Sequence, residues 1–284
     1  MKNKILITGS NGFTAKALIT ELKKIEDNTL FFSDIQKKSG QSNYFQCNLS
    51  SFEDTANLIR KILPNQVYHL AGTFTNIYNH DYDSNVITTK NILESLVKID
   101  TQIRVLLIGS AAEYGNAQME KISETTLLNP ISIYGLTKSF QTALMNYYYN
   151  NYRLNVVMAR PFNLYGKGAS TNLFIGNLFY QISKFNLGKI KKIILGDLSG
   201  ERDYLDIKDA VNDYIIIMKK GLNNEIYNVG SGKVTIIKDL VSKVFHDELI
   251  SLDVLQENNY SSSSIKKSIA DISKILKLKK DFAA

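Results

Sequence analysis

Three residues in the middle of the chain, Ser110, Tyr134 and Lys138, have the types and spacing of an acid–base site. The tyrosine and the lysine are four positions apart, so on a helix they would lie on one face. A free tyrosine titrates near pH ~10, and a neighbouring ammonium lowers that value toward the working range of an acid or base. With Ser110 donating to the same substrate oxygen, the set would exchange a proton with an alcohol or carbonyl while hydride passes to or from a nicotinamide.

Taken singly, these residues would predict only a surface helix and a turn at the end of a strand. Their order after a glycine-rich loop is far more specific. That loop, Gly9-Ser-Asn-Gly12-Phe-Thr-Ala15, follows an apolar strand and opens a helix. Gly9 would permit the tight turn, Gly12 would let the backbone approach a pyrophosphate, and Ala15 would allow close packing of helix on strand. The helix N-terminus would supply N–H groups for the phosphates.

An acidic residue, Asp34, ends the next apolar run and indicates which dinucleotide binds. A carboxylate there would accept hydrogen bonds from the ribose hydroxyls and repel a 2′-phosphate, which favours NAD(H). Lys37 and Lys38 stand nearby and could receive that phosphate, so NADP(H) stays open. Asp34 could also be no more than a turn residue.

The composition is that of an ordinary soluble globular protein: of 284 residues, 44% are hydrophobic and 21% charged. No apolar run approaches the ~20 residues of a membrane span, and the N-terminus shows no signal peptide, so we expect a cytoplasmic protein. The lysines behind the net charge of +7 are scattered, which argues against nucleic-acid binding. The single cysteine, Cys47, has no companions for a disulfide or a metal site.

Apolar runs alternate with helical patterns through the first half and predict an α/β fold, a Rossmann-like doubly wound parallel sheet. The expected strands cover 4–8, 29–33, 67–70, 104–108 and 156–159, and the expected helices cover 14–24, 52–62, 85–99 and 133–152. Beyond Pro161 we expect a strand and helix over 204–218, a strand over 225–229, helices over 236–245 and 272–278, and a serine-rich loop at 261–264. We expect a dinucleotide-binding domain over 1–163, to which 204–229 returns. A smaller, mainly substrate-binding C-terminal lobe would cover 164–284.

Further short motifs are His69-Leu-Ala-Gly72, Asn91-Ile-Leu-Glu94, Arg160-Pro-Phe-Asn163-Leu-Tyr-Gly166, Glu201-Arg-Asp-Tyr-Leu-Asp206, Tyr227-Asn-Val-Gly-Ser-Gly232 and Ala270-Asp-Ile-Ser-Lys274. With them, residues 4–274 resemble the extended short-chain dehydrogenase/reductase family, in the branch that modifies nucleotide-diphosphate sugars. The resemblance implies catalytic roles for Ser110, Tyr134 and Lys138. It implies a cofactor site formed by Gly9, Asn11, Gly12, Phe13, Asp34, Asn48, Leu49, Leu70, Ala71, Gly72, Tyr134, Lys138 and Pro161. It also implies substrate-binding roles for Ala111, Asn163, Asn172, Leu173 and Arg202, and a homodimer paired through helices 85–99 and 133–152.

The sequence departs from the family pattern at two positions. Asn48 stands where an aspartate is usual near the adenine. The second arginine that would clamp the diphosphate falls near Ser261 and is missing, although Lys266 or Lys267 could replace it as a point charge. Nucleotide affinity and nucleotide identity are therefore open.

The residues after Ser110 narrow the reaction that the resemblance implies. A 4,6-dehydratase would need an Asp-Glu pair where Ala111 and Ala112 stand, and the epimerase-reductases of fucose synthesis need a cysteine at position 112. Hydride transfer, usually at C4, remains.

Segments 108–115 and 196–203 favour a reductase of an NDP-4-keto-6-deoxyhexose, in deoxysugar or surface-polysaccharide synthesis, over an NDP-sugar 4-epimerase with bound NAD. A non-catalytic dinucleotide-binding sensor is a remote alternative, because it should have lost Tyr134 or Lys138. Glu113 we expect to point outward or to cap a local N–H rather than to touch the sugar.

Overall fold

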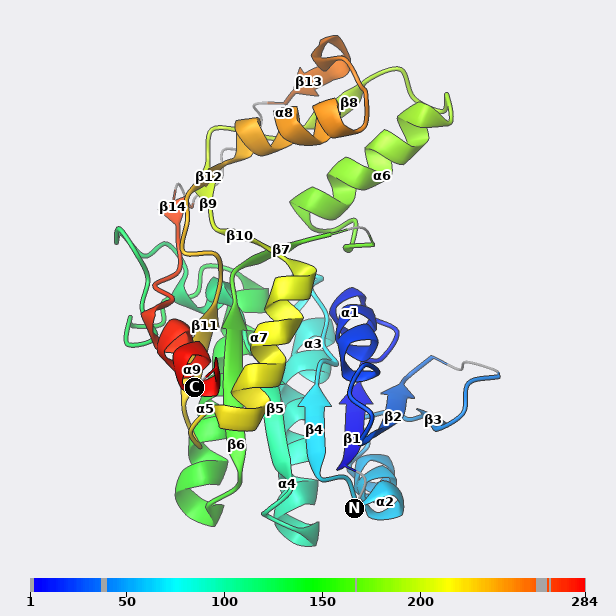
Figure 1. Ribbon diagram of the computed structural model, residues 1–284, viewed down its shortest axis with the longest axis vertical. Helices are drawn as coiled ribbons and strands as arrows, with labels where there is room; N and C mark the ends of the chain where they lie inside the picture. Colours follow the sequence, from blue (N-terminus) through cyan, green and yellow to red (C-terminus); the bar gives the residue numbers. More distant parts are fainter. Residues whose placement is uncertain (1–2, 37–39, 167, 259–264, 266, 284) are drawn as a thin grey trace.

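The computed structural model describes residues 3–36, 40–166, 168–258, 265 and 267–283. Its larger domain is a seven-stranded, wholly parallel sheet in the order β11-β6-β5-β4-β1-β2-β3 (Figure 1). The strands are β1 (Asn3–Thr8), β2 (Asn28–Asp34), β3 (Tyr44–Gln46), β4 (Gln66–His69), β5 (Arg104–Ile108), β6 (Val156–Pro161) and β11 (Ile226–Val229). The order of the strands reverses between β1 and β4, which confirms the predicted doubly wound α/β fold.

Helices cover both faces of this sheet (Figure 1). One face carries α1 (Phe13–Leu22), α7 (Ile207–Lys220) and α9 (Ser273–Ala283), and the other carries α2 (Phe52–Ile62), α4 (Thr88–Ile99) and α5 (Ile133–Tyr152). Along β1, Ile5 and Ile7 pack in the hydrophobic core on the face covered by α1, α7 and α9. Leu6 packs in the core on the opposite face, which α2, α4 and α5 cover. Because both faces are buried, the strands appear in the sequence as continuous apolar runs.

The ends of two helices follow directly from capping residues. Ser51 accepts a hydrogen bond from the Asp54 N–H at 3.2 Å and starts α2, and Ser132 accepts one from the Gly135 N–H at 3.0 Å and starts α5. Arg153 ends α5 in the left-handed region, with φ of +54°. The predicted helices 52–62 and 133–152 are both confirmed at these bounds.

A smaller lobe lies beyond the carboxyl ends of the strands, toward which the arrowheads in Figure 1 point. Its core is formed by α6 (Phe174–Asn186), α8 (Ile237–Asp247) and the paired strands β8 (Ile193–Leu195) and β13 (Leu255–Glu257), with a single turn of 3₁₀-helix over Leu252–Val254. Short strands connect the lobe to the larger domain: β7 (Asn163–Tyr165) pairs with β10 (Tyr204–Asp206), and β9 (Glu201–Arg202) lies between β12 (Thr235–Ile236) and β14 (Lys267–Ser268).

Several elements differ from the expectation. The predicted helix 85–99 starts earlier, as α3 (Tyr78–Asp81) and a π-helical segment (Tyr82–Ile87) that continues into α4. Helix α6 and strand β3 were not predicted. The last helix packs on α7 and β11 of the larger domain. The serine run 261–264 lies outside the described residues. In the part of the chain that the structure describes, no helix has the length and apolar character needed to cross a bilayer.

Candidate active site

The glycine-rich loop joins β1 to α1 beside the reversal of strand order, where doubly wound sheets bind their ligands. Gly9 has φ of +62°, and a Cβ there would lie 2.7 Å from the Ala71 backbone nitrogen, so glycine is required. Gly12 precedes α1 and has no side chain to cap it, which leaves the first N–H groups for an anion. The Ser10 hydroxyl is buried with no hydrogen-bond partner among the described residues. This cradle fits a pyrophosphate.

Asp34 ends β2 beside the glycine loop. Its carboxylate accepts the Asn11 N–H at 3.0 Å and the Gln36 N–H at 3.1 Å. The Asn11 amide in turn donates to the Tyr44 hydroxyl at 3.1 Å. The carboxylate is thus fixed at the end of the strand where the sequence places a ribose-binding group. Lys37 and Lys38 lie outside the described residues.

The other residues predicted for the cofactor follow the carboxyl ends of the strands or line the glycine loop. The Ala71 N–H donates to Thr8 Oγ1 at 3.3 Å, which ties the end of β4 to β1. Asn48 follows β3 and accepts the Ser50 N–H at 3.1 Å, and a Cβ on Gly166 would lie 3.2 Å from the Phe13 ring. The remaining members are Leu49, Leu70, Gly72 and Pro161, of which Leu49 and Pro161 are buried. The structure gathers the whole set at one edge of the sheet.

Ser110 lies two residues after the end of β5 and starts a turn of 3₁₀-helix, Ala111–Tyr114. Its hydroxyl accepts the Ala112 N–H at 3.2 Å, while its own N–H donates to Glu113 Oε1 at 2.8 Å. The Ser110 side chain also lies close enough to Tyr134 to lower the pKa of the phenol. The serine is therefore fixed by both its backbone and its side chain.

Tyr134 and Lys138 lie in the first two turns of α5, on the face that meets Ser110. The Lys138 ammonium lies 5.7 Å from the centroid of the Tyr134 ring and donates to the Ile108 carbonyl at 2.8 Å. A Cβ on Gly72 would lie only 3.6 Å from Lys138 Nζ, so the end of β4 also approaches the amine. The structure brings the three predicted catalytic residues together.

The pKa of Tyr134 departs from the expectation. Burial raises the pKa of Tyr134 to about 12, although the nearby Ser110 side chain acts to lower it. Burial also lowers the pKa of Lys138 to about 8. The lysine therefore loses its proton before the tyrosine does, and its charge does not make the phenol acidic. At neutral pH the phenol carries its proton.

A loop that sequence reasoning missed, residues 73–76, lies against Tyr134. The Phe74 ring meets the Tyr134 ring edge to face at 4.9 Å between centroids, and the Tyr134 N–H donates to Asn76 Oδ1 at 3.3 Å. Asp81, which is fully buried, accepts four hydrogen bonds from Thr73, Thr75 and the Asn76 N–H. The signal available in the sequence was an acidic residue, Asp81, shortly after the polar residues Thr73, Thr75 and Asn76.

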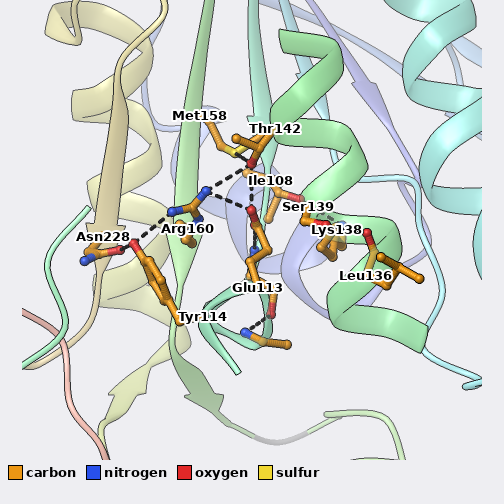
Figure 2. A network of polar contacts seen from close by, with 12 residues as sticks. Ile108, Glu113, Tyr114, Leu136, Lys138, Ser139, Thr142, Met158, Arg160 and Asn228 are labelled. Carbon is orange, nitrogen blue, oxygen red and sulfur yellow. Dashed lines mark hydrogen bonds and ion pairs between the residues drawn. The ribbon is translucent and has the colours of Figure 1, made fainter. Parts of the chain in front are cut away.

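Glu113 is fully buried and points into the protein (Figure 2). The prediction that it caps a local N–H is confirmed, because it accepts the Ser110 N–H, but the prediction that it points outward is wrong. Its second oxygen accepts from Arg160 at 2.8 Å and from Thr142 at 2.6 Å. Arg160 has an exposed fraction of 1% and also donates to the Tyr114 hydroxyl at 2.9 Å. A buried carboxylate gains from such a partner because it cannot be solvated by water.

The residues predicted for the substrate lie where the smaller lobe meets the sheet. Asn163 starts β7 and donates to the Asp203 carbonyl at 3.1 Å, and Asn172 donates to the Phe74 carbonyl at 3.3 Å. Leu173 precedes α6 and is 42% exposed, while Arg202 donates to the Ile265 carbonyl at 2.6 Å. Ala111 is in the 3₁₀ turn after Ser110. Through Asn172, the start of α6 contacts the loop that packs on Tyr134.

Lys267 does not stand beside Arg202 as a second cation. In the β14–β9 pair, Lys267 is in register with Glu201, whereas Ser268 is in register with Arg202. Because successive side chains of a strand point to opposite faces, Lys267 lies on the face opposite Arg202, with its ammonium 3.9 Å from Glu201. The suggested replacement by Lys267 is therefore wrong, and Lys266 lies outside the described residues.

Comparison with known proteins identifies the family. The sequence model of the NAD dependent epimerase/dehydratase family matches residues 5–230. GDP-6-deoxy-D-talose 4-dehydrogenase from Aggregatibacter actinomycetemcomitans is 26% identical over 96% of this chain and 90% of that protein. UDP-glucose 4-epimerase from Mycoplasma genitalium is 25% identical over 95% of this chain and 89% of that protein. The structure of RMD from Pseudomonas aeruginosa complexed with NADPH has a TM-score of 0.84 at 22% identity, over 99% of this chain and 92% of that one.

The chain belongs to the NAD dependent epimerase/dehydratase family. It is an NAD(P)-dependent enzyme of the short-chain dehydrogenase/reductase type, in the branch that modifies nucleotide sugars.

Proposed function

We propose that this enzyme reduces the C4 carbonyl of an NDP-4-keto-6-deoxyhexose. The observation that carries the proposal is the direction of Glu113, whose two oxygens both accept hydrogen bonds from buried protein groups. The preceding positions of the same turn are Ala111 and Ala112. This turn therefore offers the sugar no carboxylate for the elimination of water, whereas the Ser110–Tyr134–Lys138 set suits proton exchange with a carbonyl oxygen.

The side chains would act as follows. The Tyr134 phenol, protonated at neutral pH, donates its proton to the C4 oxygen, which Ser110 holds by a hydrogen bond. Lys138 returns a proton to the phenolate, because its lower pKa makes it the stronger acid of the two. When bound, the reduced nicotinamide dinucleotide supplies the hydride that C4 accepts. The glycine loop would hold its pyrophosphate, and Asp34 its adenosine ribose.

The smaller lobe would hold the substrate's diphosphate. Asn163, Asn172 and the first N–H groups of α6, directly after Leu173, would donate to its oxygens, and Arg202 would supply the positive charge. In support, Asn172 and Leu173 stand at the start of α6, where N–H groups point outward from the helix end.

Turnover tests the proposal directly. Purified protein supplied with NADH or NADPH should oxidise the cofactor when given a dTDP-, GDP- or CDP-linked 4-keto-6-deoxyhexose, and Y134F should retain cofactor binding while losing most turnover. No oxidation with any of these sugars would refute the reductase. A protein that merely senses the dinucleotide would keep its output in Y134F.

A 4-epimerase is the second candidate, because UDP-glucose 4-epimerase from Mycoplasma genitalium is 25% identical over most of the chain. An epimerase oxidises and then re-reduces the same carbon, so it needs no external reductant. Protein isolated with bound NAD that interconverts UDP- or GDP-hexoses without net redox change would establish this alternative.

NAD(H) is the proposed cofactor because the Asp34 carboxylate is held at the end of β2, where it would repel a 2′-phosphate. Ligands that bind the native state raise its melting temperature. NAD(H) should therefore raise it more than NADP(H) at equal concentration, and the reverse order would overturn this assignment. The same assay with dTDP, GDP, CDP and UDP would identify the nucleotide.

We also propose a homodimer formed through α4 and α5. Tyr147 and Tyr152 on α5 are 53% and 44% exposed, and such amphipathic rings suit an interface. Sedimentation at micromolar concentration should give twice the monomer mass, and Y147E/Y152E should give the monomer. A wild type that sediments as a monomer would exclude the dimer. The cytoplasmic location stays a prediction.

A further inference from the structure

Both carboxylate oxygens of Glu113 are engaged, each on a different part of the site. Oε1 accepts the backbone N–H of Ser110 at 2.8 Å, and Oε2 accepts the hydroxyl of Thr142 at 2.6 Å. Ser110 follows β5, whereas Thr142 belongs to α5, two turns beyond Tyr134. A single buried side chain thus links the backbone of the serine to the helix that carries the tyrosine.

Two glycines leave the space that this link requires. A Cβ on Gly109 would lie 2.5 Å from Glu113 Oε1, and a Cβ on Gly135 would lie 2.4 Å from the Ala112 carbonyl oxygen. The first glycine admits the carboxylate beneath the serine, and the second lets the start of α5 approach the turn after it. Together the two glycines let Glu113 and the start of α5 pack closely against the turn that begins at Ser110.

Arg160 pairs with the Glu113 carboxylate in its buried position. Its guanidinium donates to Glu113 Oε2 at 2.8 Å and to the Tyr114 hydroxyl at 2.9 Å. The Tyr114 hydroxyl donates to Asn228 Oδ1 at 2.8 Å, so the network continues from β6 to β11, as Figure 2 shows. The carboxylate is therefore anchored by strands as well as by α5.

We propose that Glu113 is a positioning residue, which holds the Ser110 side chain beside Tyr134 through the serine's backbone N–H. The kinetic part of this inference rests on the proposed reductase function. A carboxylate is required because both of its oxygens accept hydrogen bonds, whereas a glutamine has one acceptor oxygen and one donor group. The side chain introduced by E113Q could accept from either the Ser110 N–H or Arg160, and not from both.

A double-mutant cycle tests the inference. E113Q should lower kcat on the order of 10²-fold, because a small displacement of a reacting group has an effect of that size. The KM for the dinucleotide should not change. In an S110A background, E113Q should cause little further loss, because the group that Glu113 positions is already gone. Full additivity of the two losses would overturn the inference.

Two controls separate positioning from stability. In D213N the buried Asp213 loses its ion pair with Lys279, 2.5 Å away on α9, so stability should fall while kcat stays unchanged. E113Q/R160M removes the guanidinium, which frees the amide oxygen of the introduced glutamine for the Ser110 N–H and should restore kcat at least tenfold over E113Q. A kcat that stays at the E113Q level in a folded double variant contradicts the inference. If E113Q does not fold, the kcat of E113Q/R160M is compared with that of the wild type instead.

An experiment that does not depend on turnover distinguishes failure of the reductase proposal from failure of the positioning role of Glu113. If the wild type reduces no 4-keto sugar, the reductase proposal fails. The role of Glu113 is then decided by crystal structures of the wild type, of E113Q/R160M and, where it folds, of E113Q. Displacement of the Ser110 side chain away from Tyr134 in E113Q, and its return in the double variant, supports positioning. An unchanged position of Ser110 in E113Q, or a displaced one in the double variant, refutes it.

Discussion

Lys138 should make the folded protein more stable as the pH rises above neutrality, and replacing it with methionine should remove this trend. The amine is buried within α5, where it contacts the Ile108 carbonyl. Burial lowers the pKa of Lys138 to about 8, because desolvation outweighs the attraction of Glu113 and Asp81. K138M removes the titrating group while keeping a side chain of similar length.

The sign and size follow from linkage. Between the folded pKa of about 8 and the ordinary value of 10.5, the unfolded chain binds a proton at this lysine that the folded chain has released. Stability therefore rises with pH across that window. Each pH unit between the two values is worth about 1.4 kcal/mol, so the wild type should gain about 3 kcal/mol relative to K138M.

Urea unfolding of both proteins from about pH 7 to about pH 10 measures this difference. The subtraction cancels other groups, such as Cys47, whose pKa is raised to about 11 by burial. The rate of the proposed ketone reduction should fall across the same pKa, because only a protonated Lys138 can return a proton to the phenolate. A stability difference that stays flat, or that moves in favour of K138M, would refute this account of the lysine.

Two further changes test the cradle and the loop beside the tyrosine. G9A should lower the free energy of unfolding by about 2 kcal/mol or more and weaken dinucleotide binding, since its Cβ would lie 2.7 Å from the Ala71 nitrogen at a φ of +62°. G188A, at φ of +67° with nothing within 4 Å, should cost only about 1 kcal/mol, and equal losses would contradict the steric argument. D81N leaves the Asn76 N–H facing an amide donor, so urea unfolding should show that the free energy of unfolding falls by about 1.5–3 kcal/mol. The KM for the sugar should rise. An unchanged free energy of unfolding would count against the role of Asp81 as a buried acceptor.

The fold could be predicted from the sequence where local signals agree. The runs that form β1 and β5 are apolar because both of their faces are buried, and α2 and α5 begin at serines whose side chains cap them. Helix α6 gave no such signal. Its sequence is rich in aromatic and β-branched residues, and Gly176 lies within it, so the helix depends on packing in the smaller lobe rather than on propensity.

In the candidate site, too, local sequence signals predict some features, whereas others depend on contacts between distant parts of the chain. Ser110, Tyr134 and Lys138 could be predicted because each occupies a fixed place after a buried strand or in the first turns of a helix. The direction of Glu113 could not be predicted, because its partner Arg160 is 47 positions further along the chain and meets it only when β5 and β6 pair. The raised pKa of Tyr134 likewise depends on burial by several elements, which no local pattern shows.

Glu113 and Asp81 together restrict the chemistry that this site supports. Both carboxylates raise the pKa of Lys138 against the effect of burial, so they favour the protonated amine near neutral pH. Both also accept hydrogen bonds from protein groups on each of their oxygens and are fully buried. Neither is placed to remove a proton from a sugar carbon. Proton transfer by these residues therefore runs through the phenol and the amine, which suits the exchange of a proton with a sugar oxygen and supports hydride transfer over elimination.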